Sequence, residues 1–336
     1  MKAIKIIGNN HVEVIEKPKP VAHDDIVVIK VMSSGICGSE IHRLLKSKIP
    51  IEITPGHEVA GIVAEVDKAR EFKVGDRVVL DCHITCGNCN YCKNGDLIFC
   101  NKLVCFGFDI DGGDAEYLAI PENALRHLPD DISYDEGVLI VDTLGTPYHA
   151  VKKAGIKPGE LIGIFGVGPI GQLATLVAKN LGARVITIDI NNERLEKSKL
   201  FGSYHTINPK AVDIYKEVEK ITNKIGFDRI IECAGEKDSI NSALNTLKYR
   251  GKMVMLGVSA ENVEIKPWEQ IIHKEVTITG SDNFNSNEFQ ELIEFVRNNP
   301  IVRDVITHRF FIDDAQEAFD TVRSGKGLKI IIKPNI

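Results

Sequence analysis

Cys37, His57 and Glu58 offer three chemically different donors: a thiolate, an imidazole nitrogen and a carboxylate. Such a mixed set suits Zn²⁺, and three protein ligands leave one coordination position for another molecule. A glycine-rich loop of the kind that binds nucleotides follows at residues 166–171. A metal with an open position and a site for a hydride carrier together predict redox chemistry on an alcohol or a carbonyl.

A second group of metal-binding residues is a run of four cysteines. Its spacing is Cys86-x2-Cys89-x2-Cys92-x7-Cys100, and glycine–asparagine pairs between the cysteines supply turns. Four thiolates fill the tetrahedral coordination of Zn²⁺, so we predict a structural zinc site. The alternatives are an iron–sulfur cluster or disulfide bonds, but nothing else in the sequence indicates electron transfer or secretion. Of the other cysteines apart from Cys37, the apolar surroundings predict buried thiols at Cys82, Cys105 and Cys233.

The glycine-rich loop has the context of a dinucleotide site. Gly166, Gly168 and Gly171 directly follow a strand-like run at 161–165 and begin a helical pattern. The glycines allow the backbone to approach a pyrophosphate, whose charge is favoured at a helix N-terminus. Asp189, which ends the next strand-like run, can accept hydrogen bonds from both hydroxyls of a ribose and would repel a 2′-phosphate. The sequence therefore predicts NAD rather than NADP; the alternative is a glycine turn without a nucleotide.

Hydrophobic patterns change their character near residue 150. Before it, short β-branched runs such as 26–31, 59–66 and 76–80 are separated by glycine, proline and aspartate turns. After it, apolar runs alternate with helical patterns, which predicts a parallel sheet with helices on both faces. The expected strands are 161–165, 184–189, 204–207, 228–232, 252–256 and 276–279, and the expected helices begin near Pro169, Asn192, Ala211, Ser239 and Trp268.

The last part of the chain lacks a core of its own. Amphipathic helices are predicted over 288–298 and 313–324, and a strand over 329–333. We expect this tail to return to the first domain. The predicted domains are therefore 1–144 together with 284–336, including a structural zinc lobe at 82–105, and 145–283.

The composition of the 336 residues is that of an ordinary soluble enzyme, with 43% apolar and 26% charged residues and a net charge of -6. No basic stripe indicates nucleic acid, and no polybasic helix indicates a membrane surface. The N-terminus has no signal-peptide core. The uncharged stretch 161–178 contains four glycines and Pro169, which favours a buried strand, turn and helix over a membrane span. We expect a cytoplasmic protein without nucleic-acid or membrane partners.

Motifs over the whole chain carry a resemblance to a known family. They are Gly35-Ile-Cys37-Gly-Ser39-Glu40-Ile-His42, Gly56-His57-Glu58-Val-Ala-Gly61, Gly75-Asp76-Arg77-Val78, the four cysteines, the glycine loop with Asp189, and Thr307-His308-Arg309-Phe310. In this combination the chain resembles the zinc-dependent medium-chain dehydrogenases, which include alcohol, polyol and threonine dehydrogenases. The resemblance implies an α/β fold with a GroES-like β-rich catalytic domain and a Rossmann domain, whose doubly wound parallel sheet binds the coenzyme.

The resemblance also implies the ligands of a catalytic zinc. Cys37 and His57 match two ligand positions of the family. Asp142 lies where the family has its third ligand, which is a cysteine in many simple alcohol dehydrogenases and a carboxylate in others. Cys82 and Cys105 are rival third ligands. Together with the four-cysteine site, this predicts two zinc ions per chain.

Four more residues take roles near the metal through the same resemblance. Glu58 would be a fourth ligand that substrate displaces, or an acid beside the ligands. Glu40 would orient the imidazole ring by accepting its free N–H. Ser39 would take the proton of the substrate hydroxyl and pass it through the nicotinamide ribose to His42 and then to water. The residues alone also suit a simpler reading of Ser39, as the N-cap of a helix.

The family further implies which residues contact the cofactor. Arg194, five positions after Asp189, would lie beside adenine, and Lys329 would lie near the pyrophosphate. Either cation could instead be an ordinary surface charge. A homodimer or homotetramer is also implied. The loop positions assigned to the cofactor are Gly166, Gly168, Pro169, Ile170 and Gly171.

The substrate is less well defined by the sequence. Aromatic residues make up only 6% of the chain, which disfavours a pocket for a hydrophobic alcohol. The resemblance implies that the run 280–285, after the last strand of the sheet, reaches toward the substrate, and its polar side chains suit a molecule with several hydroxyl groups. The family subgroup with a carboxylate as third ligand contains mostly polyol, sugar and threonine dehydrogenases. We expect NAD-linked oxidation of a secondary alcohol of a polyol, sugar acid or (amino)cyclitol to the ketone. The alternatives are an L-threonine 3-dehydrogenase, a simple alcohol dehydrogenase and, outside the enzymes, a nucleotide-binding structural or sensor protein.

Overall fold

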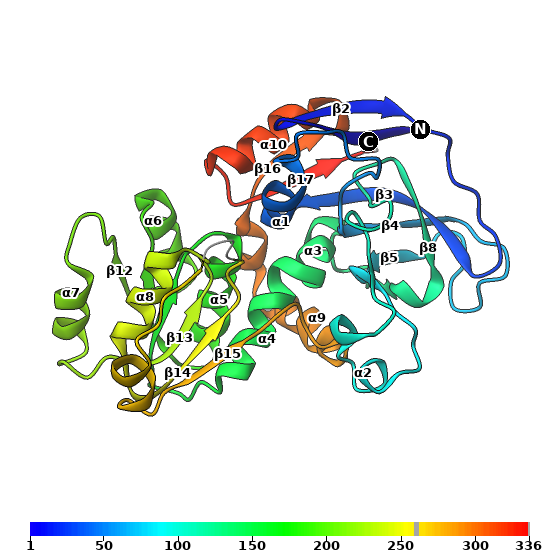
Figure 1. The fold of residues 1–336 in the computed structure, drawn as a ribbon. Helices are drawn as coiled ribbons and strands as arrows, with labels where there is room; N and C mark the ends of the chain where they lie inside the picture. The colour runs from blue at the N-terminus through cyan, green and yellow to red at the C-terminus, as the bar shows by residue number, and fades with distance from the viewer. Residues whose placement is uncertain (259–261, 335–336) are drawn as a thin grey trace. The chain divides into compact units, whose positions relative to one another are not determined.

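The structure, a computed structural model, describes residues 1–258 and 262–334. The chain forms two compact units. The first contains Met1–Asp142 and Asn285–Ile336, and the second contains Thr143–Phe284. Each unit has its own large β-sheet (Figure 1).

One mixed sheet forms the framework of the first unit. Its strands, in spatial order, are β16 (Ile306–Phe311), β17 (Lys329–Lys333), β3 (Ile26–Ile36), β4 (Glu58–Glu65), β5 (Arg77–Leu80) and β9 (Leu125–His127), and β8 (Tyr117–Pro121) also pairs with β3. β16 and β17 are parallel, and the other pairings are antiparallel. Two small antiparallel sheets pair β1 (Lys2–Gly8) with β2 (His11–Glu16) and β6 (His83–Ile84) with β7 (Val104–Cys105).

Alternating apolar residues hold the first unit together. Val27, Ile29 and Val31 lie two residues apart on β3, so they share one face of the sheet and are fully buried. Burial of each such side chain contributes about 1.5–3 kcal/mol to folding. The C-terminal strand joins the same sheet, because Ile331 of β17 lies opposite Gly35 of β3. Its Ile330 and Ile332 pack in a second core cluster with Ile36.

Short helices connect the strands of the first unit. α3 (Tyr134–Leu139) packs against β3 and β4, and its capping box satisfies the free N–H groups at its start through Ser133 and Glu136. The π-helical turn η4 (Ile140–Leu144) follows it directly. The other helices and helical turns are α1 (Gly38–Glu40), η1 (Ile41–Leu45), α2 (Asn90–Lys93), η2 (Leu97–Phe99), η3 (Glu122–Ala124), η6 (Ser286–Glu288), α9 (Phe289–Asn298), η7 (Pro300–Val305), η8 (Ile312–Asp314) and α10 (Ala315–Ser324).

A parallel sheet forms the second unit. In spatial order its strands are β12 (His205–Ile207), β11 (Arg184–Ile188), β10 (Leu161–Phe165), β13 (Phe227–Glu232), β14 (Leu247–Met255) and β15 (Thr277–Gly280). β10, the first of these strands in the chain, lies in the middle of the sheet. The next two strands are added on one side of β10 and the last three on the other, which is the doubly wound arrangement of dinucleotide-binding domains. The predicted Rossmann-like fold is confirmed. Ligands of such sheets bind at the carboxyl ends of the strands, at the point where the strand order reverses, here between β10 and β13.

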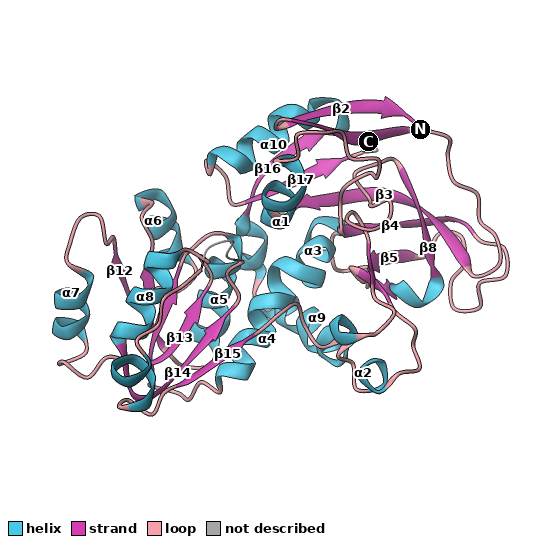
Figure 2. Cartoon of the chain, viewed as in Figure 1, coloured by secondary structure: helices cyan, strands magenta, loops and turns pink. Residues whose placement is uncertain are grey.

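Helices alternate with the strands of this sheet along the chain (Figure 2). Two of them differ from the prediction, one in its start and one in its kind. The helix expected near Ala211 begins at Ile214, because Asp213 caps it by accepting hydrogen bonds from the next backbone N–H groups. The helix expected near Trp268 is only a π-helical turn, η5 (Pro267–Ile272). The other helices are α4 (Gly145–Ala154), α5 (Pro169–Asn180), α6 (Asn192–Leu200), α7 (Ile214–Ile221) and α8 (Lys237–Thr246).

The uncharged stretch 161–178 consists of strand β10, the glycine turn and most of helix α5. The strand and the helix are largely buried inside the second unit. Within the part of the chain that the structure describes, no helix is both long enough and apolar enough to cross a membrane.

Candidate active site

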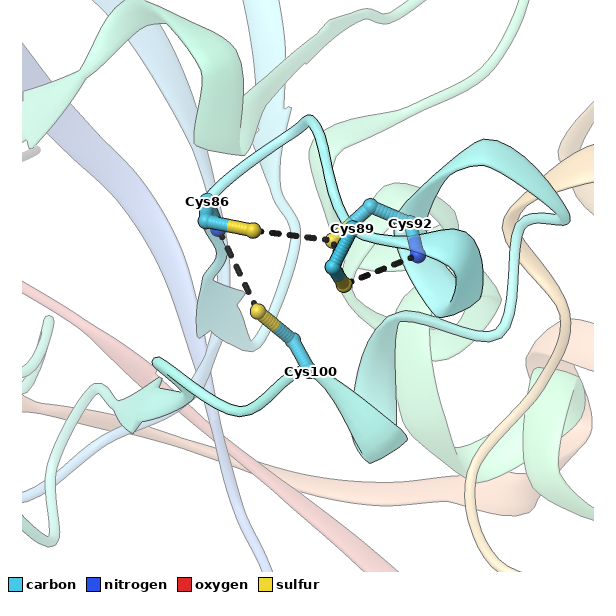
Figure 3. Close-up of side chains that lie close together, drawn as sticks. All are labelled: Cys86, Cys89, Cys92 and Cys100. Atoms are coloured by element: carbon cyan, nitrogen blue, oxygen red, sulfur yellow. Dashed lines mark hydrogen bonds between the residues drawn. The ribbon is translucent and has the colours of Figure 1, made fainter.

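The four cysteines of the predicted structural zinc site lie together between β6 and β7 (Figure 3). Their sulfur atoms all lie within 4.8 Å of one another. Cys92 Sγ is 3.4 Å from Cys89 Sγ and 3.9 Å from Cys86 Sγ. A tetrahedral zinc ion with bonds of about 2.3 Å places its sulfur ligands about 3.8 Å apart. The donor set and its spacing therefore fit zinc.

Backbone N–H groups support these sulfur atoms in a way that favours thiolates. Cys100 Sγ accepts hydrogen bonds from the N–H groups of Cys86 and Lys102, and Cys89 Sγ accepts one from Cys92. Backbone hydrogen bonds from Asn88 and Cys89 lower the pKa of Cys86 to about 6. Backbone contact with Cys92 also lowers the pKa of Cys89, whereas desolvation raises the pKa of Cys92 to about 11. The loop thus stabilises the charged form that binds a metal at Cys86 and Cys89.

The four-cysteine loop is attached to the residues that precede α9. The side-chain amide of Asn285 donates hydrogen bonds to the Asn94 carbonyl and to the Asp96 carboxylate, and Ser286 N–H donates to the Gly95 carbonyl. Asn285 belongs to the polar run 280–285 that we interpreted as facing a substrate. Its amide instead holds the cysteine loop in place.

A second group of metal donors contains Cys37, His57, Glu58 and Asp142. Their donor atoms also lie within 4.8 Å of one another. Asp142 Oδ2 is 3.5 Å from Cys37 Sγ and 3.4 Å from His57 Nε2. A tetrahedral zinc ion separates sulfur, nitrogen and oxygen ligands by about 3.4–3.6 Å. These three residues can therefore bind one zinc ion with little rearrangement.

Sheet pairing explains why Cys37 and His57 meet although twenty positions separate them. Strands β3 and β4 are antiparallel, and Gly35 lies opposite Glu58. Cys37 directly follows β3 and His57 directly precedes β4, so both residues lie at the same end of this strand pair. Asp142 reaches them from the π-helical turn η4.

Glu40 orients two of the candidate ligands. One carboxylate oxygen, Oε1, lies 3.2 Å from His57 Nδ1 and accepts a hydrogen bond from Gly56 N–H. The other, Oε2, accepts a hydrogen bond from Cys37 N–H. Glu40 is completely buried, so these contacts hold the imidazole with Nε2 toward Asp142. A carboxylate behind a ligating histidine is a common way to fix ring orientation and increase ligand basicity.

The pKa directions in this group reflect buried acids that crowd one another. Burial raises the pKa of the Cys37 thiol, and the Asp142 carboxylate raises it further. Burial alone would lower the pKa of His57, but hydrogen bonds with Asp142, Cys37 and Glu40 raise it well above its usual value. A divalent cation would favour the thiolate and the neutral imidazole, which are the forms that bind metals. The raised pKa values of Cys37 and His57 favour the protonated groups, so metal binding would release protons from this site.

Lys329 has a partner that sequence reasoning missed. Its ammonium is buried, where it forms an ion pair with Glu58 and donates a hydrogen bond to the Ile36 carbonyl. A contact of Lys329 with the pyrophosphate of the cofactor stays a prediction. Burial alone would lower the pKa of Lys329, but Glu58 raises it, so the lysine stays cationic. Burial also raises the pKa of Glu58 to about 7, although Lys329 opposes this change.

The two residues of the predicted proton path lie just after Cys37. Ser39 is half-buried in α1, and His42 is exposed in η1. The two rival ligands differ in position. Cys82 Sγ donates to the carbonyl of Val141, the residue directly before Asp142, whereas Cys105 lies on β7. Neither belongs to a group of metal donors in the described residues.

Asp114 is a buried carboxyl group that sequence reasoning did not single out. Its Oδ1 accepts a hydrogen bond from Ser34 Oγ at 2.6 Å, whereas its Oδ2 has no hydrogen-bond partner among the described residues. Burial raises the pKa of Asp114 to about 8, and the charge of Glu40 contributes to the shift. The carboxyl group is therefore mainly protonated at neutral pH in the folded protein.

This shift predicts a pH dependence of stability. The unfolded chain releases the Asp114 proton near pH 4, whereas the folded chain holds it until about pH 8, so stability falls as the pH rises between these values. Asp114→Asn cannot ionise and removes this loss. We expect the free energy of unfolding of the variant, relative to the parent, to increase by about 2–4 kcal/mol between pH 5 and pH 8.

Thermal unfolding at several pH values measures this difference. The exposed Asp25→Asn is the control, because its carboxylate faces water in the folded protein. A difference between the Asp114→Asn variant and the parent that is the same at pH 5 and pH 8 would contradict the raised pKa.

The glycine loop of the second unit connects β10 to α5. Gly166 has a φ of 81°, which favours glycine, and a Cβ atom at Gly171 would lie 1.9 Å from the Gly166 carbonyl oxygen. The close approach of these two residues requires glycine at both positions. Pro169 and Ile170 begin α5 and are half-buried. The N-terminus of this helix thus follows a turn in which Gly166 and Gly168 have no side chains and the Val167 side chain is buried, a geometry that suits a pyrophosphate.

Asp189 and Arg194 lie beside the same loop. The Asp189 carboxylate accepts hydrogen bonds from Val167 N–H at 2.7 Å and from Asn191 N–H at 2.8 Å. A Cβ atom built on Gly168 would lie 3.9 Å from a guanidinium nitrogen of Arg194. The structure therefore brings the predicted ribose acid, the predicted adenine-side cation and the glycine loop together.

Comparison with known proteins identifies a family for both units of the chain. Residues 23–130 match the model of the alcohol dehydrogenase GroES-like domain, and residues 169–298 match that of the zinc-binding dehydrogenase. The sorbitol dehydrogenase of Halalkalibacterium halodurans is 31% identical over 97% of both chains. The L-threonine 3-dehydrogenase of Marinomonas sp. is 33% identical over 99% of this chain and 100% of the relative.

A solved structure shows the same fold over the full length. Galactitol-1-phosphate dehydrogenase from Escherichia coli superposes with a TM-score of 0.90 at 27% identity, covering 99% of this chain and 100% of the other. The GroES-like and Rossmann-like units, the two zinc sites and the full-length relatives thus lead to one conclusion. The chain belongs to the zinc-dependent medium-chain alcohol dehydrogenase family and is a zinc-dependent dehydrogenase that acts on CH–OH donors.

Proposed function

We propose that this dehydrogenase oxidises a secondary alcohol of a polyol, sugar acid or (amino)cyclitol to the ketone and transfers the hydride to NAD. The observation that carries the proposal is the donor set in which Asp142 completes a site with Cys37 and His57. Relatives named sorbitol dehydrogenase and galactitol-1-phosphate dehydrogenase support a substrate with several hydroxyl groups.

The catalytic roles follow from where the residues lie. Bound at Cys37, His57 and Asp142, zinc would polarise the substrate hydroxyl and lower its pKa. We propose that Ser39 accepts the hydroxyl proton and that exposed His42 releases it to water. Glu40 keeps the His57 ring in place throughout. The carbinol carbon loses its hydrogen as a hydride, so one proton and one hydride leave the alcohol and a ketone remains.

Glu58 is proposed to act close to the metal without being a permanent ligand. Its donor atom lies within 4.8 Å of those of the other three residues, yet its carboxylate is already paired with Lys329. The ion pair would keep the Glu58 carboxylate beside the metal site, where it could become a zinc ligand after substrate has left. The four-cysteine site is proposed to be structural, because its four sulfur atoms leave no position for a substrate.

A preference for NAD over NADP is proposed from Asp189. The carboxylate beside the glycine loop can bind the ribose hydroxyls and would repel a 2′-phosphate. Asp189→Ala is expected to raise the KM for NAD roughly 10- to 100-fold, since charge-assisted hydrogen bonds of about 1.5–3 kcal/mol are lost. The ratio of kcat/KM for NAD to that for NADP should fall. Steady-state kinetics with NAD and with NADP measure both the KM and this ratio.

Asp189→Asn provides the matched control, because the carboxylate also fixes the loop through Val167 and Asn191. The amide keeps one acceptor oxygen but removes the charge. A relaxed preference in both variants assigns the discrimination to charge. An unchanged preference in both would remove this role from Asp189.

A substrate panel tests the proposed reaction. Zinc-replete enzyme with NAD is assayed with polyols, sugar acids, aminocyclitols, L-threonine and short alcohols. We expect the highest kcat/KM with a polyhydroxylated secondary alcohol, and a clear preference for short primary alcohols would overturn the proposal. L-Threonine is the second candidate because of the 33% identical relative of that name.

Zinc analysis of the purified protein separates the enzyme from a nucleotide-binding sensor. An enzyme of the proposed kind holds about two zinc ions per chain, and a sensor would hold only the one in the cysteine site. A homodimer or homotetramer stays a prediction, which light scattering can test.

A further inference from the structure

A stack of three side chains connects Arg43 to the candidate catalytic metal. The rings of His57 and Phe108 have their centroids 5.3 Å apart, tilted by 42°. On Phe108, the guanidinium carbon of Arg43 lies 4.3 Å from the ring centroid. His57 and Phe108 are wholly or partly buried, and Arg43 is exposed. A positive charge is therefore held two ring contacts from a zinc ligand.

The charge of Arg43 is not compensated by an acid. It forms no ion pair in the described residues, and the carboxylate of Asp109, the acidic neighbour of Phe108, accepts a hydrogen bond from Cys105 N–H. Five other arginines of the same unit pair with acids, namely Arg77, Arg126, Arg297, Arg309 and Arg323, whereas Arg70 and Arg303 resemble Arg43 in forming no ion pair in the described residues. An arginine that is fixed in position but has no acidic partner is available to a ligand.

Stacking leaves the hydrogen-bonding capacity of Arg43 intact. A cation–π contact between a guanidinium group and an aromatic ring uses none of the N–H donors for conventional hydrogen bonds, so these donors can still bind a ligand. The planar fork of the guanidinium group matches the two oxygens of a carboxylate or phosphate. The Phe108 centroid lies 5.3 Å from that of His57 and 4.3 Å from the Arg43 guanidinium carbon, so this carbon is at most about 10 Å from the imidazole. Because a C–C bond is about 1.5 Å long, a polyol of about six carbons with polar contacts at both ends matches this separation.

We propose that Arg43 selects substrates that carry an anionic group, a carboxylate or a phosphate, several carbons from the hydroxyl that is oxidised. This inference rests on the proposed function and narrows its substrate class. Phe108 positions the arginine, and the arginine sets specificity by pairing with the anion.

The experiment compares three substrates that share a carbon skeleton: sorbitol, gluconate and sorbitol 6-phosphate. The parent enzyme, Arg43→Gln and Arg43→Lys are assayed with saturating NAD. Lys46→Gln is the matched control, because Lys46 is an exposed cation three positions away without a contact to Phe108 in the described residues. Thermal unfolding verifies that every variant is folded.

We expect the parent to prefer one of the two anionic substrates over sorbitol, and the preferred one distinguishes carboxylate from phosphate. Arg43→Gln should lower kcat/KM for that substrate about 10- to 100-fold more than for sorbitol, mainly through KM. Arg43→Lys should lose less, since lysine keeps the charge but not the fork. Lys46→Gln should change the three substrates equally.

Equal losses with neutral and anionic substrates, or a parent that prefers sorbitol, would overturn the inference while the proposed reaction stands. An effect of Arg43→Gln confined to the KM for NAD would also overturn it, because the arginine would then serve the cofactor. Failure of the proposed function has a different signature, which is a clear preference for short primary alcohols or the absence of NADH formation with every alcohol in the panel.

Discussion

The Asp142→Asn enzyme is expected to lose its catalytic zinc and at least about 100-fold in turnover, because even residues that only support a ligand contribute 10- to 100-fold. Asp142 Oδ2 is 3.5 Å from Cys37 Sγ and 3.4 Å from His57 Nε2, so it completes the donor set. Asparagine has the same shape but no charge, and a neutral amide is a poor zinc ligand. Zinc content should fall from about two ions to one per chain.

Cofactor binding should change little in this variant, because the glycine loop and Asp189 lie in the other unit. NADH fluorescence titration measures it, and elemental analysis measures the zinc. Asp142→Cys is the matched comparison, since a thiolate restores a charged ligand, and we expect it to hold two zinc ions. Two zinc ions and full turnover in Asp142→Asn would move the third ligand elsewhere, for example to Cys82.

Local sequence patterns were sufficient where ligands or backbone turns are close in the chain. Cys86, Cys89 and Cys92 are three residues apart, so a single tight loop brings their sulfur atoms together whatever the rest of the fold does. The glycine loop was equally predictable, because 166 and 171 need glycine for reasons that lie within the turn itself. The alternation of strands and helices gave the parallel sheet in the same way.

Contacts between distant segments carried no local signal. Glu58 and Lys329 are separated by 271 positions, and only the pairing of β17 with β3 brings the lysine next to the start of β4. The composition of this glycine-rich segment alone predicts an exposed lysine, because lysines are rarely buried unless they are paired. The apolar strand 329–333 was the available clue, since the first residue of a buried strand can be buried as well.

Other departures have the same origin. The helix predicted near Trp268 ends after one turn, and the polar run 280–285 contributes Asn285 to the cysteine loop rather than to a substrate. Arg43 and Phe108 belong to segments with no shared motif. In each case, the hydrophobic periodicity of a segment predicts a helix or a strand but not which distant residues its side chains contact. Those contacts depend on how strands pair across the unit.

Lys329→Met is expected to destabilise the first unit by about 3–5 kcal/mol, because it leaves the buried Glu58 carboxylate without its cationic partner. For a unit of this size, the loss corresponds to a decrease in Tm of roughly 6–20 °C. Methionine keeps the length and the apolar stem of lysine, so the missing ammonium is the main change. Differential scanning calorimetry of the zinc-loaded protein measures the decrease.

The double variant Lys329→Met with Glu58→Gln separates charge from packing. Because the glutamine amide is neutral, no charge remains buried without a partner, and we expect the double variant to recover part of the lost Tm. Lys326→Met is the control, since Lys326 is exposed in the same segment and should leave Tm within a few degrees. If Lys329 instead served the pyrophosphate, Lys329→Met would raise the KM for NAD while Tm stayed unchanged. That result would contradict the ion pair with Glu58 as the main role of this lysine.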